Sequence, residues 1–103
     1  MSTPHPTFIM KFTAQPGKRD ALIEQAVKGF ELASGIERWS VYRDDEDPDL
    51  IWVIETFASD EAVEQHRAHQ DQDHVNAVGS LMAGPESFTR TTVHAAAASY
   101  PLP

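Results

Sequence analysis

The segment 50–57 carries large apolar side chains at both alternating positions, and this constrains the fold more than any other feature of the chain. Val, Ile, Trp and Phe favour a pleated strand, and a strand that is apolar on both faces needs cover on both faces. The segment runs into Ser59, whose hydroxyl suits the N-cap of a helix, and then into two acidic residues that suit its first turn. The sequence therefore predicts a buried strand that leads directly into a helix.

Apolar periodicity and turn residues predict the remaining elements. In addition to 50–57, strands are expected at 7–13, 36–43 and 88–94, and an amphipathic helix is expected at 18–33. The stretch 59–82 loses its apolar content at residues 70–73, which indicates two short helices separated by a kink. The resulting order is β-α-β-β-α-β, a ferredoxin-like α+β fold with a four-stranded antiparallel sheet and both helices on one face.

A chain of 103 residues fits a single domain, here residues 7–94, with a flexible leader at 1–6 and a C-terminal tail at 95–103. The first three strands carry hydrophobic residues at both alternating sets of positions, which point to opposite faces of the sheet. The face away from the helices is therefore expected to be largely apolar. A domain of this size buries roughly two-thirds of its unfolded surface, and two short helices cannot cover both faces of the sheet. Two sheets packed face to face would cover them, so the sequence predicts a homodimer.

The charge of the chain narrows its range of partners. Sixteen acidic and eight basic residues give a formal charge of −8, which argues against nucleic acid and anionic membrane surfaces. The acidic run 44–49 is expected to be a solvated hairpin loop, because it lacks the spaced ligands and central Gly of a calcium loop. Without cysteine the chain can form neither a disulfide nor a thiolate metal site. No stretch is apolar enough to span a bilayer and no signal-peptide pattern is present, so a cytoplasmic location is expected.

Three of the five histidines, His66, His69 and His74, lie close together in the second helical region, after the strand carboxylate Glu55. This cluster is the expected site of any chemistry, because imidazole titrates near neutral pH. His66 and His69 are spaced to share one helix face, as metal ligands do, with His74 or Asp73 as a third ligand. Residue 74 lies two turns beyond residue 66, which makes a poor triad, so no metal is predicted.

Two segments beside the acidic loop carry a recognisable pattern. Residues 34–48 read Ser-Gly-Ile-Glu-Arg-Trp-Ser-Val-Tyr-Arg-Asp-Asp-Glu-Asp-Pro, a glycine-led strand that ends in a Tyr-Arg-Asp hairpin. Residues 51–66 read Ile-Trp-Val-Ile-Glu-Thr-Phe-Ala-Ser-Asp-Glu-Ala-Val-Glu-Gln-His, with Glu two residues before an aromatic and Glu-Ala followed by His. Over roughly residues 7–92 the chain resembles the antibiotic biosynthesis monooxygenase (ABM) family.

The resemblance implies a dimeric α/β barrel. For characterised members it also implies oxidation of quinols or polycyclic phenols by molecular oxygen without flavin, haem or metal. Glu55, Phe57 and His66 match the family pattern position by position. The family's second histidine, five residues after the first, would fall on Asp71, or on His74 if the chain carries a short insertion. Members that degrade haem use an Asn on the first strand, and the first strand here contains none, so haem degradation is not inferred.

Oxygenation without a cofactor requires the substrate itself to donate the electron, which an electron-rich phenol does best as its anion. A base and a closed apolar pocket suffice, and the predicted catalytic residues are His66, as the proton acceptor, and Glu55. The predicted substrate-binding residues are Trp52, Tyr42, Phe57, His69, His74 and Arg43. Trp52 and Tyr42 would flank a flat ring, and Arg43 would stabilise a phenolate or peroxide anion.

These residues also have structural interpretations. His66 would pack between helix and sheet with a hydrogen bond to Glu55, Trp52 would belong to the core, and Arg43 would be a surface ion-pair partner. We therefore expect a homodimeric, cofactor-independent monooxygenase that acts on a small quinol or polyphenol with molecular oxygen. The alternative is a non-catalytic ligand-binding or stress-response module of the same fold, which would bind a phenol without consuming oxygen.

Overall fold

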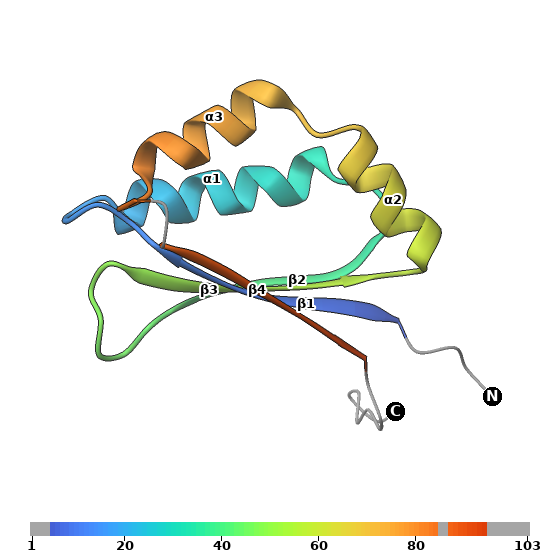
Figure 1. The fold of residues 1–103 in the computed structure, drawn as a ribbon, viewed down its shortest axis with the longest axis horizontal. Coiled ribbons are helices and arrows are strands. Elements are labelled where there is room, and N and C mark those ends of the chain that lie inside the picture. The colour runs from blue at the N-terminus through green and yellow to red at the C-terminus, as the bar shows by residue number, and fades with distance from the viewer. Residues whose placement is uncertain (1–4, 85–86, 95–103) are drawn as a thin grey trace.

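The computed structural model describes residues 5–84 and 87–94, and it contains a four-stranded sheet and three helices (Figure 1). The strands are β1 (Pro6–Thr13), β2 (Ile36–Arg43), β3 (Leu50–Phe57) and β4 (Phe88–His94). The helices are α1 (Arg19–Leu32), α2 (Asp60–Ala68) and α3 (Gln72–Leu81). Every predicted element is present with its ends close to the expected residues, and the ferredoxin-like α+β class is confirmed.

The sheet is antiparallel throughout, with strand order β2-β3-β1-β4, so β1 and β3 form its centre. All three helices lie over one face of this sheet (Figure 1). Glu55 on β3 pairs with Phe8 on β1 and with Trp39 on β2, which places these three side chains on the same face. Met10 and Val53 pair on that face too. The register of β1, β2 and β3 therefore decides which residues the helices cover.

The hydrophobic core lies between this face and the helices. Its most deeply buried large side chains are Phe57, Leu22, Ile51 and Val53. The Phe8 and Phe57 rings meet edge-on, with their centroids 5.7 Å apart. Leu22 docks α1 on the sheet, and burying a side chain of this size contributes roughly 1.5–3 kcal/mol.

The second helical region divides into α2 and α3, as the sequence predicted. Ser59 caps α2 by accepting the backbone N–H of Ala62 at 3.1 Å, which confirms the predicted N-cap. Asp71 caps α3 in the same way by accepting the N–H of His74 at 2.9 Å. Because Asp71 satisfies a free N–H of a new helix, the chain can end α2 at Ala68 and start α3 in a different direction (Figure 1).

The acidic run 44–49 forms the hairpin loop between β2 and β3. One of its carboxylates stabilises the loop conformation through hydrogen bonds. The carboxylate of Asp44 accepts two backbone N–H groups of the loop, and it also accepts the indole N–H of Trp52 at 3.0 Å. The hydrogen bond from Trp52 is the main reason that the pKa of Asp44 is lowered. From α1, Arg19 donates to the carbonyl oxygens of Asp44 and Asp47 at 3.3 and 3.0 Å.

The sheet face away from the helices is mixed, and the expectation of a largely apolar surface is not met. By register, Ile9, Ile54 and Trp52 lie on this face together with Lys11 and Ser40. The Lys11 ammonium lies 5.5 Å from the centroid of the Trp52 ring. The sequence of a single strand shows that it has apolar residues on both faces. It does not show which polar residues of the neighbouring strands lie beside them on the same face.

β1 begins at Pro6, inside the segment expected to be a leader. The expected tail at 95–103 lies outside the described residues. Among the residues that the structure describes, none of the helices is both long enough and apolar enough to cross a membrane.

Candidate functional site

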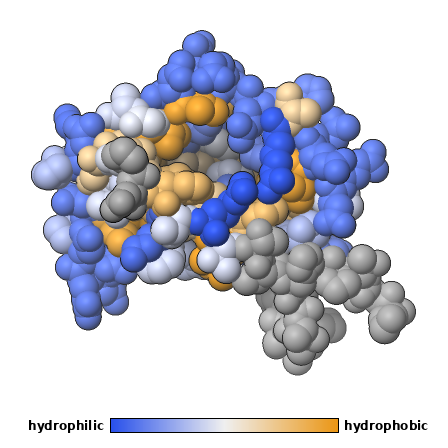
Figure 2. Space-filling model, in the orientation of Figure 1, coloured by the Kyte–Doolittle hydropathy of each residue, from blue (hydrophilic) through white to orange (hydrophobic). Residues whose placement is uncertain are grey.

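A cavity of about 400 Å³ lies between the helix-covered face of the sheet and the helices. Figure 2 shows a hollow with hydrophobic side chains inside it and hydrophilic side chains around it. The strands line it with Phe8, Met10, Phe12, Trp39, Ile51, Val53, Glu55, Phe57, Phe88 and Arg90. The helices and the residues that join or follow them line it with Leu22, Ala26, Gly29, Leu32, Val63, His66, Arg67, His69, Gln70, Asp71, His74, Val75, Val78, Gly79 and Met82. A mostly apolar cavity of this size suits a small aromatic molecule.

Glu55 lies on β3, one of the two central strands of the sheet, and is only 8% exposed, which is unusual for a carboxyl group. Burial raises its pKa from 4.5 to about 7, and the nearby positive charge of Arg90 offsets only part of that rise. Within the described part of the chain, its carboxyl group forms no hydrogen bond and no ion pair. Glu55 is therefore close to half protonated at neutral pH, so it can either accept or donate a proton.

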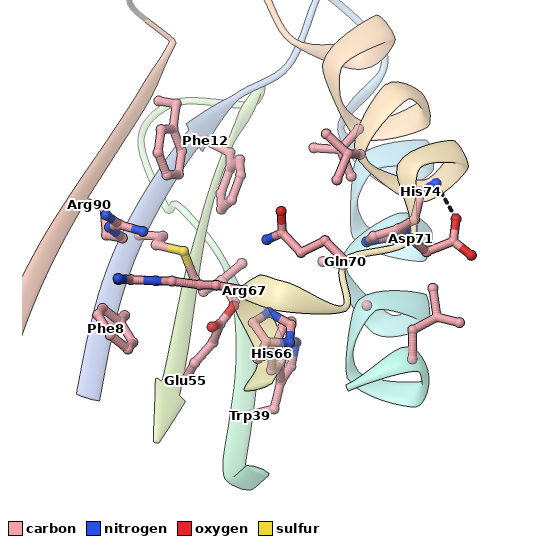
Figure 3. Close-up of a pocket in the computed structure, with 18 of the residues that line it drawn as sticks. Phe8, Phe12, Trp39, Glu55, His66, Arg67, Gln70, Asp71, His74 and Arg90 are labelled. Atoms are coloured by element: carbon pink, nitrogen blue, oxygen red, sulfur yellow. Dashed lines mark hydrogen bonds between the residues drawn. The ribbon is translucent and has the colours of Figure 1, made fainter. Parts of the chain in front are cut away.

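His66 lies in the last turn of α2 and is partly buried against aromatic rings. The centroid of its ring is 5.3 Å from that of Phe57 and 6.4 Å from that of Trp39. Burial lowers its pKa below 6.5, and the charges of Arg67 and His74 lower it further. His66 is therefore a neutral imidazole at pH 7. It lies at the same end of the cavity as Glu55 and Trp39 (Figure 3), but the predicted hydrogen bond between His66 and Glu55 is not formed.

His74 on α3 approaches this group from the other helix. Its Nδ1 lies 3.2 Å from the amide oxygen of Gln25 on α1, and it donates to that oxygen, which leaves Nε2 free to accept. A side chain at Gly29 would meet His74 Nε2 at 3.0 Å and Trp39 Cζ2 at 3.4 Å. Gly29 therefore lets both rings come close to α1. Burial lowers the pKa of His74, and Lys28 lowers it further.

The two candidates for the family's second histidine have different positions in the structure. Both line the cavity, but the carboxylate of Asp71 accepts the backbone N–H of His74 as the N-cap of α3. The imidazole of His74 retains a free nitrogen. His69, another predicted binding residue, is exposed at the edge of the cavity and donates from Nδ1 to the carbonyl oxygen of Gln65 at 2.9 Å. Phe57 is fully buried in the wall beside His66.

Three predicted substrate-binding residues, Trp52, Tyr42 and Arg43, are not part of the cavity lining. Trp52 and Tyr42 pair with each other on the opposite face of the sheet, where Tyr42 is 51% exposed. Arg43 is exposed and lies 3.5 Å from the carboxylate of Asp20 on α1, as expected for a surface ion pair. These three side chains cannot contact a ring that is bound beside His66. For Trp52 and Tyr42 the reason is the face of the sheet, since Glu55 and Trp39 point to the other face. Arg43 lies at the end of β2 on the same face as Trp39, but its side chain extends to Asp20 on α1 and not into the cavity.

The structure adds four residues to the candidate site that the sequence did not single out. Trp39 takes the place expected of Trp52, while Arg67, Arg90 and Gln70 surround the mouth of the cavity. The indole Nε1 of Trp39 is buried, and it has no hydrogen-bond partner among the described residues. The pairing of Trp39 with Glu55 would have identified it, but that register is not visible in the sequence.

The histidines do not form a metal centre with the other candidate ligands that the structure describes. In residues 5–84 and 87–94, no group of three or more His, Asp or Glu side chains is arranged to hold a metal ion. Of the pair proposed from its i,i+3 spacing, His66 packs against aromatic rings and His69 bonds to its own helix.

Comparison with known proteins adds to this geometry. The family model for the antibiotic biosynthesis monooxygenases matches residues 7–78. A crystal structure from Chloroflexus aurantiacus J-10-fl, provisionally assigned as an antibiotic biosynthesis monooxygenase, is 29% identical, with a TM-score of 0.74 over 91% of this chain and 97% of that chain. A protein from Pseudomonas aeruginosa is 24% identical, with a TM-score of 0.75 over 94% of this chain and 98% of that chain. A provisionally assigned antibiotic biosynthesis monooxygenase from Caulobacter crescentus CB15 is 20% identical, with a TM-score of 0.73 over 91% and 92%. No curated protein matched the sequence.

Proposed function

This chain belongs to the antibiotic biosynthesis monooxygenase family, and from that membership we propose that it oxidises a small quinol or polyphenol with molecular oxygen and without a cofactor. One observation carries the proposal. Glu55 and His66, a buried carboxyl and a neutral imidazole, line the same apolar cavity of about 400 Å³. A flat ring bound there would meet both titratable groups and a mostly apolar wall.

The two titratable groups suit opposite roles in proton transfer. Burial raises the pKa of Glu55 to about 7 and lowers that of His66. Near neutral pH, therefore, the Glu55 carboxyl can still hold a proton while the His66 imidazole is unprotonated. Such a divergence is typical of an acid and base pair in an active site. His66 would accept a hydroxyl proton from the substrate, and Glu55 would donate a proton to the departing oxygen.

The oxygen chemistry follows from the anion that His66 would create. The phenolate transfers one electron to O₂, and the resulting radical pair combines to form a carbon–oxygen bond as a ring hydroperoxide. The same ring carbon then loses its C–H proton to a base as the O–O bond breaks. The outer oxygen leaves as water with a proton from Glu55, and the other oxygen atom stays on the ring. A quinol thus becomes a hydroxyquinone. The substrate supplies all four electrons that reduce O₂, and no external reductant is needed.

Ring binding would use the aromatic wall beside His66. The rings of Phe57 and Trp39 lie at 5.3 and 6.4 Å from the imidazole by centroid, so a substrate ring could stack near the base. The same contacts favour a second candidate function, because an imidazole among aromatic rings is also a typical packing residue. In that case the cavity would bind a phenol without consuming oxygen.

Oxygen uptake with a panel of quinols distinguishes the two functions. If His66 is the base, we expect His66→Ala to lower the rate roughly 10²- to 10⁴-fold while the protein stays folded. His5→Ala is the matched control, because His5 lies outside the cavity lining and its ring contacts Glu37. The rate of the unaltered protein should rise as His66 loses its proton below pH 6.5 and fall as Glu55 loses its proton near pH 7. An unchanged rate in folded His66→Ala would favour the binding module.

A further inference from the structure

Two guanidinium groups from different parts of the chain meet at the mouth of the cavity. Arg67 follows His66 on α2, and Arg90 lies on the edge strand β4. The Cζ atoms of Arg67 and Arg90 lie 5.5 and 5.6 Å from the centroid of the same ring, that of Phe8. Figure 3 shows both side chains reaching toward this ring from different directions. We call Arg67 and Arg90 the arginine pair.

The arginine pair lacks a carboxylate partner in the described part of the chain. The ion pairs found there involve Arg43 with Asp20 and His5 with Glu37, and neither member of the arginine pair takes part in one. This is unexpected for a chain with twice as many acidic as basic residues. Two like charges held near one ring repel each other, and contact with the ring face compensates only partly.

The acidic residues of the cavity lining do not neutralise the arginine pair. The carboxylate of Asp71 accepts the backbone N–H of His74 at the start of α3 and points away from the arginine pair (Figure 3). Glu55 is influenced by the charge of Arg90, but burial outweighs that influence and keeps its carboxyl largely uncharged below neutral pH. An additional anion at the mouth would therefore find two positive charges and little opposing negative charge.

We infer that the natural ligand of the cavity is an aromatic molecule that carries a carboxylate, and that Arg67 and Arg90 together bind this carboxylate. The inference rests on the proposed function only in placing the ligand in the same cavity. A guanidinium group donates two parallel N–H groups to a planar carboxylate, which suits recognition of this group. A singly charged carboxylate fits better than a dianion, because the buried Glu55 would be near a second negative charge.

The test compares two probes that share one ring system and differ in charge. Calorimetric titration would use 2-naphthoate and its neutral carboxamide, 2-naphthamide, with the intact protein and three variants. We expect Arg67→Gln and Arg90→Gln each to weaken naphthoate binding about 10-fold, and the double variant to weaken it about 100-fold. Binding of 2-naphthamide should change less than about 2-fold in every variant, because the neutral amide loses no charge-assisted contact.

Arg38→Gln is the matched control, because Arg38 is exposed on the opposite face of the sheet. It should leave the affinity for both probes unchanged, and thermal melting would confirm that every variant is folded. Undiminished naphthoate affinity in the double variant, an equal loss for both probes, or no naphthoate binding to the intact protein would each overturn the inference. Oxygen uptake is measured separately. A protein that oxidises no quinol but binds naphthoate through the arginine pair would refute the proposed function alone.

Discussion

At the scale of single residues, Glu55 has the most demanding environment in the chain. It lies in the centre of the sheet with Phe8 and Trp39 as its cross-strand neighbours. Removing a carboxylate from water is costly, and a buried acid without a hydrogen-bond partner responds by holding its proton. A buried carboxyl group that lines a cavity and has a raised pKa is the kind of group that serves as a proton donor in active sites.

This raised pKa makes stability depend on pH in a direction opposite to that of most carboxylates. Between pH 4.5 and about 7 the folded state holds a proton on Glu55 that the unfolded state has lost, so stability falls as pH rises through this window. A shift of this size corresponds to about 3 kcal/mol. In Glu55→Gln that decline should disappear, as measured by urea unfolding at pH 4.5 and 7.5.

His66 and His74 have the opposite effect on the pH dependence of stability. Because their pKa values are lowered in the folded state, the protein loses stability as pH falls below 6.5 and through those values. Both remain in the variant, so the difference between variant and unaltered protein isolates Glu55. Glu64→Gln, which alters an exposed carboxyl on α2, is the control and should keep the pH dependence. A decline that persists in Glu55→Gln would mean that its carboxyl does not titrate as described.

At the scale of elements, the sequence was sufficient for the strands and helices but not for their faces. Alternation defined the strands, and the polar run before His74 located the break between α2 and α3, where Asp71 begins a new helix. The site required the register. Because β3 is apolar at both parities, nothing in its sequence tells whether Trp52 or Glu55 faces the helices. Choosing the wrong face led to Trp52 in place of Trp39 as the ring beside His66.

The approach of α2 to β2 depends on Gly35, and a matched pair of glycines tests this. Gly35 and Gly17 both have positive φ, at 72° and 78°, so alanine at either position is strained. A Cβ at Gly35 would also lie 2.7 Å from the Cβ of Ala62 on α2, whereas a Cβ at Gly17 meets nothing within 4 Å. We expect Gly17→Ala to lower the free energy of unfolding by about 1–2 kcal/mol. Gly35→Ala should lower it by roughly a further 1–3 kcal/mol. Equal losses in urea unfolding would show that the contact with α2 is not tight.

At the scale of the whole molecule, the sheet face opposite the helices is the surface on which we expect a second copy of the chain to pack. Ile9, Trp52 and Ile54 lie on it beside polar residues, and the half-exposed Tyr42 adjoins them. We expect a homodimer in which two such faces pack together, with a total interface of roughly 2,000 Å² or more. Sedimentation at micromolar concentration should give twice the chain mass, and Ile54→Glu should weaken the assembly by placing a charge in the interface. A folded monomer at that concentration would refute the dimer.

The measurement that tests the proposed monooxygenase activity most directly follows the oxygen atoms. Chelator-treated protein would be incubated with a reactive quinol under ¹⁸O₂, and the masses of the products would be measured by mass spectrometry. One ¹⁸O atom should enter the quinone product and the other should leave as water, with one O₂ consumed for each quinol and no added cofactor. Tight binding of the quinol without oxygen consumption, or release of labelled hydrogen peroxide with an unlabelled quinone, would contradict a monooxygenase.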